Sequence, residues 1–136
     1  MKLNSYLTFN GQCEAAFKFY EQCLRGKIVT MLTNGESPIA SQLPSESRNQ
    51  ILHARLTVGD QVLMGSDAPA ERYENTKGFS VAIGTADVAE AERIFHALAE
   101  KGTVQMPIQE TFWAVRFGMV VDRFGIPWMI NCEQAA

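Results

Sequence analysis

Two stretches decide the fold, CEAAFKFYEQCLRG at residues 13–26 and VAEAERIFHALAEKG at residues 88–102. In both, apolar residues recur every three or four positions, which predicts an amphipathic helix that a glycine ends. Setting Gly26 on Gly102 gives an offset of 76 residues. The same offset aligns two further pairs, Phe19 with Phe95 and Ala15 with Ala91. This repetition predicts a chain built from two copies of one unit.

Extended segments surround both helices in the same order. Alternation of apolar and polar residues predicts strands at 6–9, 27–33, 51–58, 61–64, 79–84, 103–108, 114–121 and 127–131. Stretches rich in Gly, Pro, Ser and Asn predict long loops at 34–50 and 66–77. Each half is therefore a βαβββ module, about 1–67 and 78–136, and the fold class is α+β.

Neither module has enough apolar surface to be stable alone. We expect one domain, 1–136, in which the modules pack together or swap between two chains, with curled mixed sheets that form a concave cleft. Local signals indicate how the helices begin and end. Asn10-Gly11 is expected to cap the first helix and Asp87, with Glu90, the second. Gly26 is expected to be a left-handed terminator of the first helix, and Gly102 is expected to end the second.

Composition limits the possible partners. The chain has 136 residues, 46% hydrophobic and 20% charged, with a formal net charge of −3. It carries no basic cluster, no apolar run of bilayer length and no signal peptide, so we expect a cytoplasmic protein that binds neither nucleic acid nor membrane. Its three cysteines lack the spacing of a disulfide framework or a zinc site, and Cys13 and Cys23 are expected in the helix core.

Several motifs resemble one protein family. They are YLTFNG at 6–11, FKFY at 17–20, HARLTVGDQVLMGSDAP at 53–69, GFSVAI at 78–83 and QETFWAVRFGMVVDRFGIPWMIN at 109–131. The pattern resembles the vicinal-oxygen-chelate superfamily (glyoxalase, bleomycin resistance, dioxygenase), and its PhnB-like branch, which carries a 3-demethylubiquinone 3-methyltransferase label. The resemblance implies a paired βαβββ fold, usually a homodimer, with a ligand cleft on the concave face of the sheets.

The resemblance also indicates where a metal would bind. Metal-dependent members of the superfamily draw His or Glu ligands from the first and last strands of each module. Those places fall here near Tyr6, Met64 or Ser66, Phe79 or Ser80, and Met129. None is a good ligand for a divalent ion that chelates oxygens, and the chain has only two histidines, so we expect no metal and no other cofactor. A divalent metal recruited by carboxylates remains the alternative. A glycine-rich turn for S-adenosylmethionine is also absent from the sequence.

Two sets of residues are candidates for ligand binding. His53 and Arg55 share one face of their strand, and Arg116 has a roughly corresponding place in the second module. If that face is concave, the two arginines and the imidazole would bind a carboxylate, phosphonate or enolate and move a proton. Alternatively, His53 is structural and the arginines pair with surface carboxylates. Phe112 and Trp113 are expected to wall a pocket for an aromatic ligand, whereas Trp128 is expected in the core or at a dimer interface.

The leading hypothesis is a dimeric small-molecule binding protein without the usual metal site. Its ligand would be an anionic or aromatic metabolite. The residues expected to line the ligand site are Tyr6, His53, Arg55, Met64, Phe112, Trp113, Arg116 and Met129. The alternative is an enzyme of the lyase, isomerase or transferase type that uses His53 as general base or a metal recruited at the cleft.

Overall fold

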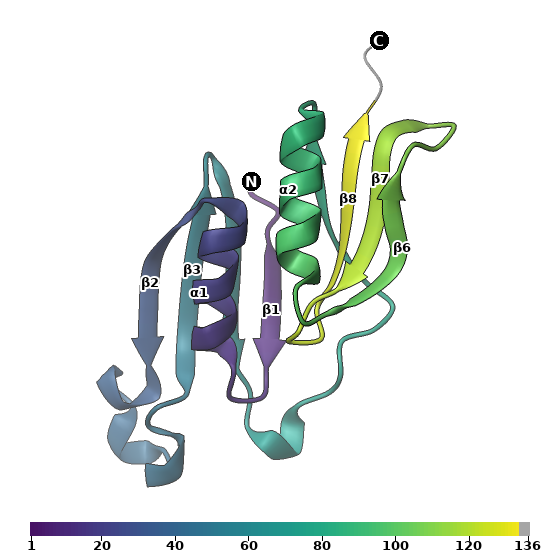
Figure 1. Ribbon diagram of the computed structural model, residues 1–136. Helices are drawn as coiled ribbons and strands as arrows, with labels where there is room; N and C mark the ends of the chain where they lie inside the picture. The colour runs from purple at the N-terminus through teal and green to yellow at the C-terminus, as the bar shows by residue number, and fades with distance from the viewer. Residues whose placement is uncertain (134–136) are drawn as a thin grey trace. The chain divides into compact units, whose positions relative to one another are not determined.

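A computed structural model describes residues 1–133, so the last three residues of the second expected module lie outside the described part. The chain divides into two compact units, Met1–Glu74 and Asn75–Ala136. Each unit contains one long helix and one four-stranded sheet (Figure 1). No helix within residues 1–133 is long and apolar enough to cross a membrane.

Both units have the same topology. The elements of unit 1 are β1 (Ser5–Phe9), α1 (Cys13–Leu24), β2 (Lys27–Thr33), β3 (Ile51–Val58) and β4 (Gln61–Asp67). Those of unit 2 are β5 (Val81–Thr85), α2 (Val88–Ala99), β6 (Thr103–Gln109), β7 (Ala114–Val121) and β8 (Pro127–Glu133). The strand orders are β1-β4-β3-β2 and β5-β8-β7-β6, with the first and last strands of each unit parallel and the other pairs antiparallel. This confirms the α+β class and the two βαβββ modules with mixed sheets.

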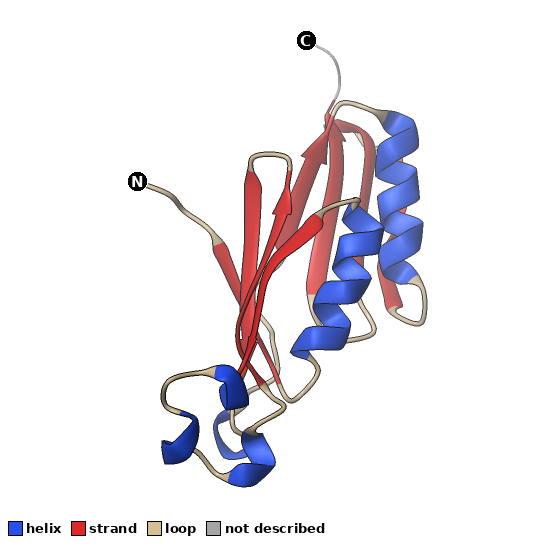
Figure 2. Cartoon of the chain, turned by 90° about the vertical axis from the view of Figure 1, so that its left-hand side faces the viewer, coloured by secondary structure: helices blue, strands red, loops and turns tan. Residues whose placement is uncertain are grey.

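Each helix covers one face of its own sheet (Figure 2). The buried side chains of the helices are Cys13, Ala16, Phe17, Tyr20 and Cys23 in α1 and Ala91, Ile94, Phe95 and Leu98 in α2. The first four residues of the α1 set lie 78 residues before the four of the α2 set, so Phe17, and not Phe19, has the place of Phe95. The expected offset of 76 holds for the strands that flank the helix and is wrong by two residues for the buried helix positions.

The glycines after the helices have a different role from the expected one. The left-handed residues are Arg25 and Lys101, with φ of 53° and 59°, and neither Gly26 nor Gly102 has positive φ. A Cβ on Gly26 would lie 2.6 Å from the carbonyl oxygen of Thr57, and a Cβ on Gly102 would lie 2.5 Å from that of Val121. Glycine is needed at these positions because the chain passes against the end of a neighbouring strand.

The first helix also begins differently from the expectation. Its N-cap is Gln12, whose side chain makes no capping hydrogen bond, and not Asn10-Gly11. The carboxylate of Asp67, at the end of β4, accepts hydrogen bonds from the backbone N–H of Cys13 (3.0 Å) and of Ile51 (2.8 Å). One side chain therefore satisfies the first N–H of α1 and the first N–H of β3. The second helix begins as expected, because Asp87 accepts from the N–H groups of Ala89 and Glu90.

The two expected loops contain more structure than the sequence indicated. Residues 34–50 form three short 3₁₀ turns, Asn34–Glu36, Ala40–Gln42 and Ser45–Ser47. In the second loop, β4 extends to Asp67 and a 3₁₀ turn spans Ala70–Arg72, while the strand expected at 79–84 is Val81–Thr85.

Candidate functional site

The face of each sheet opposite its helix, called here the open face, carries the candidate residues. In unit 1, Tyr6 of β1 is the register partner of Met64 of β4, which is in turn the partner of Arg55 of β3. Side chains of paired residues stand on the same face of a sheet. Tyr6, Met64 and Arg55 therefore form one row across three neighbouring strands, and His53 lies two residues before Arg55 on the same face.

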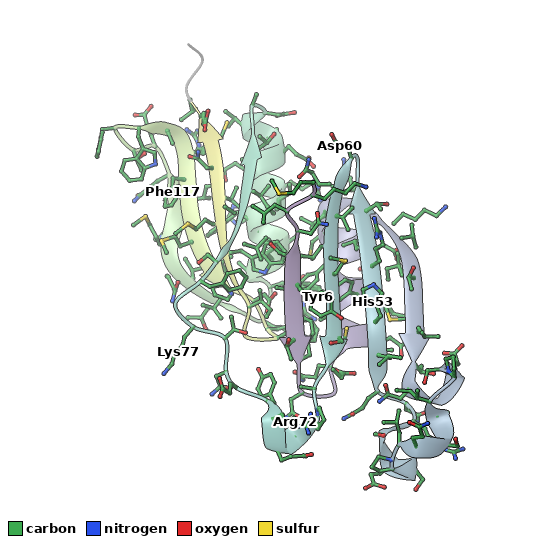
Figure 3. The ribbon with its side chains drawn as sticks, turned by 180° about the vertical axis from the view of Figure 1, so that it is seen from behind. Tyr6, His53, Asp60, Arg72, Lys77 and Phe117 are labelled. Carbon is green, nitrogen blue, oxygen red and sulfur yellow. The ribbon has the colours of Figure 1, made fainter. Side chains whose placement is uncertain are left out.

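Tyr6 and His53 contact each other across β4 (Figure 3). The phenol oxygen of Tyr6 lies 3.2 Å from Nδ1 of His53, and the two rings are stacked with centroids 5.8 Å apart. This contact fixes the orientation of the imidazole and leaves Nε2 as its available nitrogen. If the phenol donates to Nδ1, the neutral ring carries its proton on Nε2; if the phenol accepts, Nε2 is a base.

Arg55 differs from the other half-buried arginines of the described chain. Arg93 pairs with Glu90 at 2.6 Å, Arg116 with Glu92 at 2.9 Å and Arg123 with Glu100 at 3.4 Å. Arg55 is also half-buried, but within residues 1–133 its guanidinium makes no hydrogen bond or ion pair. A guanidinium offers five N–H donors in a fixed fork, so this one is available for an external acceptor.

The open face of unit 2 has a different chemical character. Met106 of β6 is the register partner of Met119 of β7, which is the partner of Met129 of β8. These three half-buried thioethers form a row in which Met129 and Met119 have the places of Met64 and Arg55 in unit 1, and Met106 has the place of Thr30. Thioethers are polarizable and adapt to the shape of an apolar partner.

An aromatic cluster adjoins this methionine row. Trp113 makes edge contacts with Phe112 (centroids 4.7 Å apart) and with Phe117 (5.4 Å apart). Phe112 is 91% exposed and Trp113 is 46% exposed. The structure therefore brings Phe112 and Trp113 together, beside a strand that also carries Phe117.

Arg116 does not have the place that the sequence suggested. Thr30 pairs with Arg55 in unit 1, and Met106 with Met119 in unit 2, so Met119 is the counterpart of Arg55. Arg116 instead lies on the helix side of its sheet, where its Nε donates to Glu92 of α2 at 2.9 Å. The sequence reasoning missed Phe117 and Met119 as open-face residues. The small Gly118 between them was a signal that its own side faces the helix. A Cβ on Gly118 would lie 2.7 Å from the Phe95 ring of α2.

The residues at the expected metal positions do not fit a divalent ion. Tyr6 supplies a phenol that already contacts His53, and Met64 and Met129 supply thioethers, which suit soft metals. Among residues 1–133, no three His, Cys, Asp or Glu side chains are placed to hold a metal together. Two carboxylates that could otherwise recruit a metal are hydrogen-bonded within the fold: Asp67, as described above, and Asp122, which accepts from Phe124, Ile126 and Trp128.

The buried side chains confirm two expectations about the core. Cys13 and Cys23 are buried in α1, and burial, followed by the nearby carboxylates of Asp67 and Glu14, raises the pKa of the Cys13 thiol far above its usual range. Such a thiol is inert, which agrees with a structural role. Trp128 is 1% exposed and its indole N–H donates to Asp122 at 2.8 Å, so it belongs to the core.

Comparison with known proteins identifies the family. The family model described as 3-demethylubiquinone-9 3-methyltransferase matches residues 1–131. The chain belongs to this family. The motifs quoted above, which resembled the branch with the 3-demethylubiquinone 3-methyltransferase label, therefore gave the right family.

Relatives of this 3-demethylubiquinone-9 3-methyltransferase family match over nearly the whole chain. Protein YjdN of Escherichia coli K12 is 35% identical over 96% of this chain and 95% of its own. The crystal structure of protein PA1353 from Pseudomonas aeruginosa is 48% identical, covers 99% of both chains and has a TM-score of 0.91. Fosfomycin resistance protein FosX from Mesorhizobium loti, at 10% identity, has a TM-score of 0.65 over 98% of this chain and 92% of its own, which shows a shared fold alone.

Proposed function

We propose that this family member is a glyoxalase-like small-molecule binding protein, and that the open face of unit 1 takes a small organic anion such as a carboxylate or a phosphonate. The observation that carries the proposal is Arg55, the half-buried guanidinium without a partner among residues 1–133. A half-buried cation is favoured when an anion accepts its hydrogen bonds, and each bond to a charged group contributes about 1.5 to 3 kcal/mol.

Neighbouring side chains would complete this anion site. The phenol of Tyr6 and the imidazole of His53 stand on the same face as Arg55 and are already held by their mutual contact. Little side-chain entropy is then lost when the group whose proton is not used in this contact, the phenol or Nε2 of the imidazole, donates to a ligand. Met64 stands between Tyr6 and Arg55 in this row, and its thioether offers a surface for the flat side of an aromatic ligand, since a thioether makes favourable contacts with rings.

Titration with phenylphosphonate tests this site. We expect Arg55→Ala to weaken binding by about tenfold to a hundredfold, which corresponds to the loss of one charge-assisted hydrogen bond of the guanidinium. Arg123→Ala removes the same charge from the turn between β7 and β8 and should change the affinity less than about twofold. Isothermal titration calorimetry measures both, with benzyl alcohol as the neutral probe. Equal loss in the two variants, or equal binding of benzyl alcohol, would contradict the proposal.

The contact between Tyr6 and His53 favours one second candidate, an enzyme in which Nε2 of His53 is the general base. In that case His53→Ala abolishes turnover of the carbon-acid substrate while the ligand affinity stays within a few fold, and Tyr6→Phe lowers turnover because the ring loses its fixed orientation. A binding protein shows no turnover to lose.

Three expectations accompany the proposal: a cytoplasmic location, a homodimer and no bound metal. The last is supported by the thioether and phenol donors at the positions where the resemblance places the metal ligands. Native mass spectrometry and elemental analysis of protein purified without chelator measure the oligomeric state and the metal content directly, and near-stoichiometric zinc, nickel, manganese or iron would overturn the expected absence of a metal.

A further inference from the structure

We propose that unit 1 has a second ligand site, separate from its open face, that binds a small organic cation with an apolar body. The site is a cavity of about 550 Å³ at one end of the sheet, called here the loop pocket. It is lined by Asn34, Ile39, Leu43, Pro44, Glu46, Ser47, Gln50, Leu52, Asp67, Pro69, Ala70 and Glu71. The short turns that form its walls lie beyond the ends of β3 and β4 (Figures 1 and 2).

Hydrogen bonds hold the main wall of the loop pocket in place. The two ends of the loop 34–50 are joined, because the N–H of Asn34 donates to Gln50 O at 2.9 Å and the N–H of Gly35 donates to Arg48 O at 2.9 Å. The side chain of Asn34 also donates to Ser47 O at 3.0 Å. Compact loops with joined ends are often functional, and a wall that is already ordered loses little entropy when a ligand binds.

The charges around the loop pocket select a cation. Three carboxylates line it, those of Glu46, Glu71 and Asp67, and no Lys or Arg does. Glu46 and Glu71 form no ion pair within residues 1–133. Both oxygens of Asp67 accept backbone N–H groups, which holds this carboxylate in place. A ligand with a negative charge is repelled here and one with a positive charge is attracted.

The remaining lining selects an organic ligand over a metal ion. Side chains of Ile39, Leu43, Leu52 and two prolines give the cavity an apolar wall. Its volume lies within the range of about 300 to 1,000 Å³ that is typical of small-molecule sites. The described residues contain no cluster of His, Cys, Asp or Glu that could hold a metal. An ammonium or amidinium group attached to an alkyl or aromatic body would satisfy both the carboxylates and the apolar wall.

Amide NMR of the full-length ¹⁵N-labelled protein tests the loop pocket with four probes: n-hexylammonium, n-hexanol, tetramethylammonium and n-hexanoate. We expect n-hexylammonium to shift the amides of Gln50, Leu52 and Ala70 with saturation near about 1 mM. We expect n-hexanol, which is neutral, tetramethylammonium, which has no alkyl tail, and n-hexanoate, which is anionic, to bind at least about fivefold more weakly than n-hexylammonium. If the lining amides do not shift below about 10 mM n-hexylammonium, or if n-hexanol binds equally well, the proposal is wrong.

Matched charge variants test the role of the carboxylates. Glu46→Gln with Glu71→Gln should weaken n-hexylammonium binding about fivefold. Asp60→Asn with Glu110→Gln removes the same net charge from two exposed positions outside the cavity and should change the affinity less than about twofold. All four residues are exposed, so these variants are expected to fold. An equal effect of both pairs would show a general charge effect and overturn the proposal. Because Arg55 lies on the open face, Arg55→Ala should leave this binding unchanged, which separates the two sites.

Discussion

Replacement of Asp122 by alanine should destabilise the protein by about 3 to 4 kcal/mol, the largest loss that we expect from a single substitution. Asp122 is 3% exposed, and its carboxylate accepts from the backbone N–H of Phe124 (2.8 Å) and of Ile126 (3.1 Å) and from the indole N–H of Trp128 (2.8 Å). Alanine leaves all three donors in place without an acceptor. Each buried donor that loses its partner costs about 1 kcal/mol or more.

Urea unfolding followed by tryptophan fluorescence measures this effect, because both tryptophans of the chain, Trp113 and Trp128, lie in unit 2. Asp60→Ala is the matched control, since Asp60 occupies the β3–β4 turn of unit 1 but is exposed. Its free energy of unfolding should change by less than about 0.5 kcal/mol. Asp122→Asn should be intermediate, because the amide retains one acceptor oxygen for the two backbone donors. A loss below about 1 kcal/mol for Asp122→Ala would mean that water replaces the carboxylate.

Gly102→Ala is the substitution with the second large expected effect, and it should lower the free energy of unfolding by about 2 to 3 kcal/mol. The new methyl group would lie 2.5 Å from the carbonyl oxygen of Val121 and 3.1 Å from the Cα of Asp122, and both are backbone atoms that cannot rotate away. Gly26→Ala in unit 1 meets the carbonyl oxygen of Thr57 at 2.6 Å and should cost a similar amount.

Gly84→Ala is the control for both glycine variants and should have the opposite sign. A Cβ on Gly84 has no atom within 4 Å, and its φ is not positive. Alanine there restricts the unfolded chain and should stabilise the protein by about 0.4 to 1 kcal/mol. Thermal unfolding of the three variants compares them directly. A neutral Gly102→Ala would show that the end of β7 moves away from the turn after α2.

The sequence was sufficient for the parts of the fold that depend on local periodicity. The two helices, the order of strands and helix along each module and the burial of Cys13, Cys23 and Trp128 follow from the spacing of apolar residues, and the structure agrees. The helix ends were assigned wrongly at Gly26 and Gly102. A glycine after a helix has two physical uses, positive φ or close approach, and only tertiary packing decides between them.

The candidate site was harder to predict from the sequence, because it too depends on tertiary packing. Alternation along β7 separates two sets of side chains but does not say which set faces the helix, and Arg116 was therefore assigned to the wrong side. The capping role of Asp67 is also a long-range contact, because 54 residues separate it from Cys13. The anion-binding role of Arg55, the roles of the other proposed ligand residues and the absence of a metal stay predictions.

The parallel pairing of the first and last strands in each unit has a consequence for the order of events during synthesis. All strands of the unit 1 sheet lie within residues 5–67, and β1 is hydrogen-bonded to β4, which is made last. This sheet can therefore close only when Asp67 has left the ribosome, but it can close before β5 exists. Domains made first generally fold first. By the same pairing of its first and last strands, β5 with β8, the unit 2 sheet can close only after Glu133 has been made.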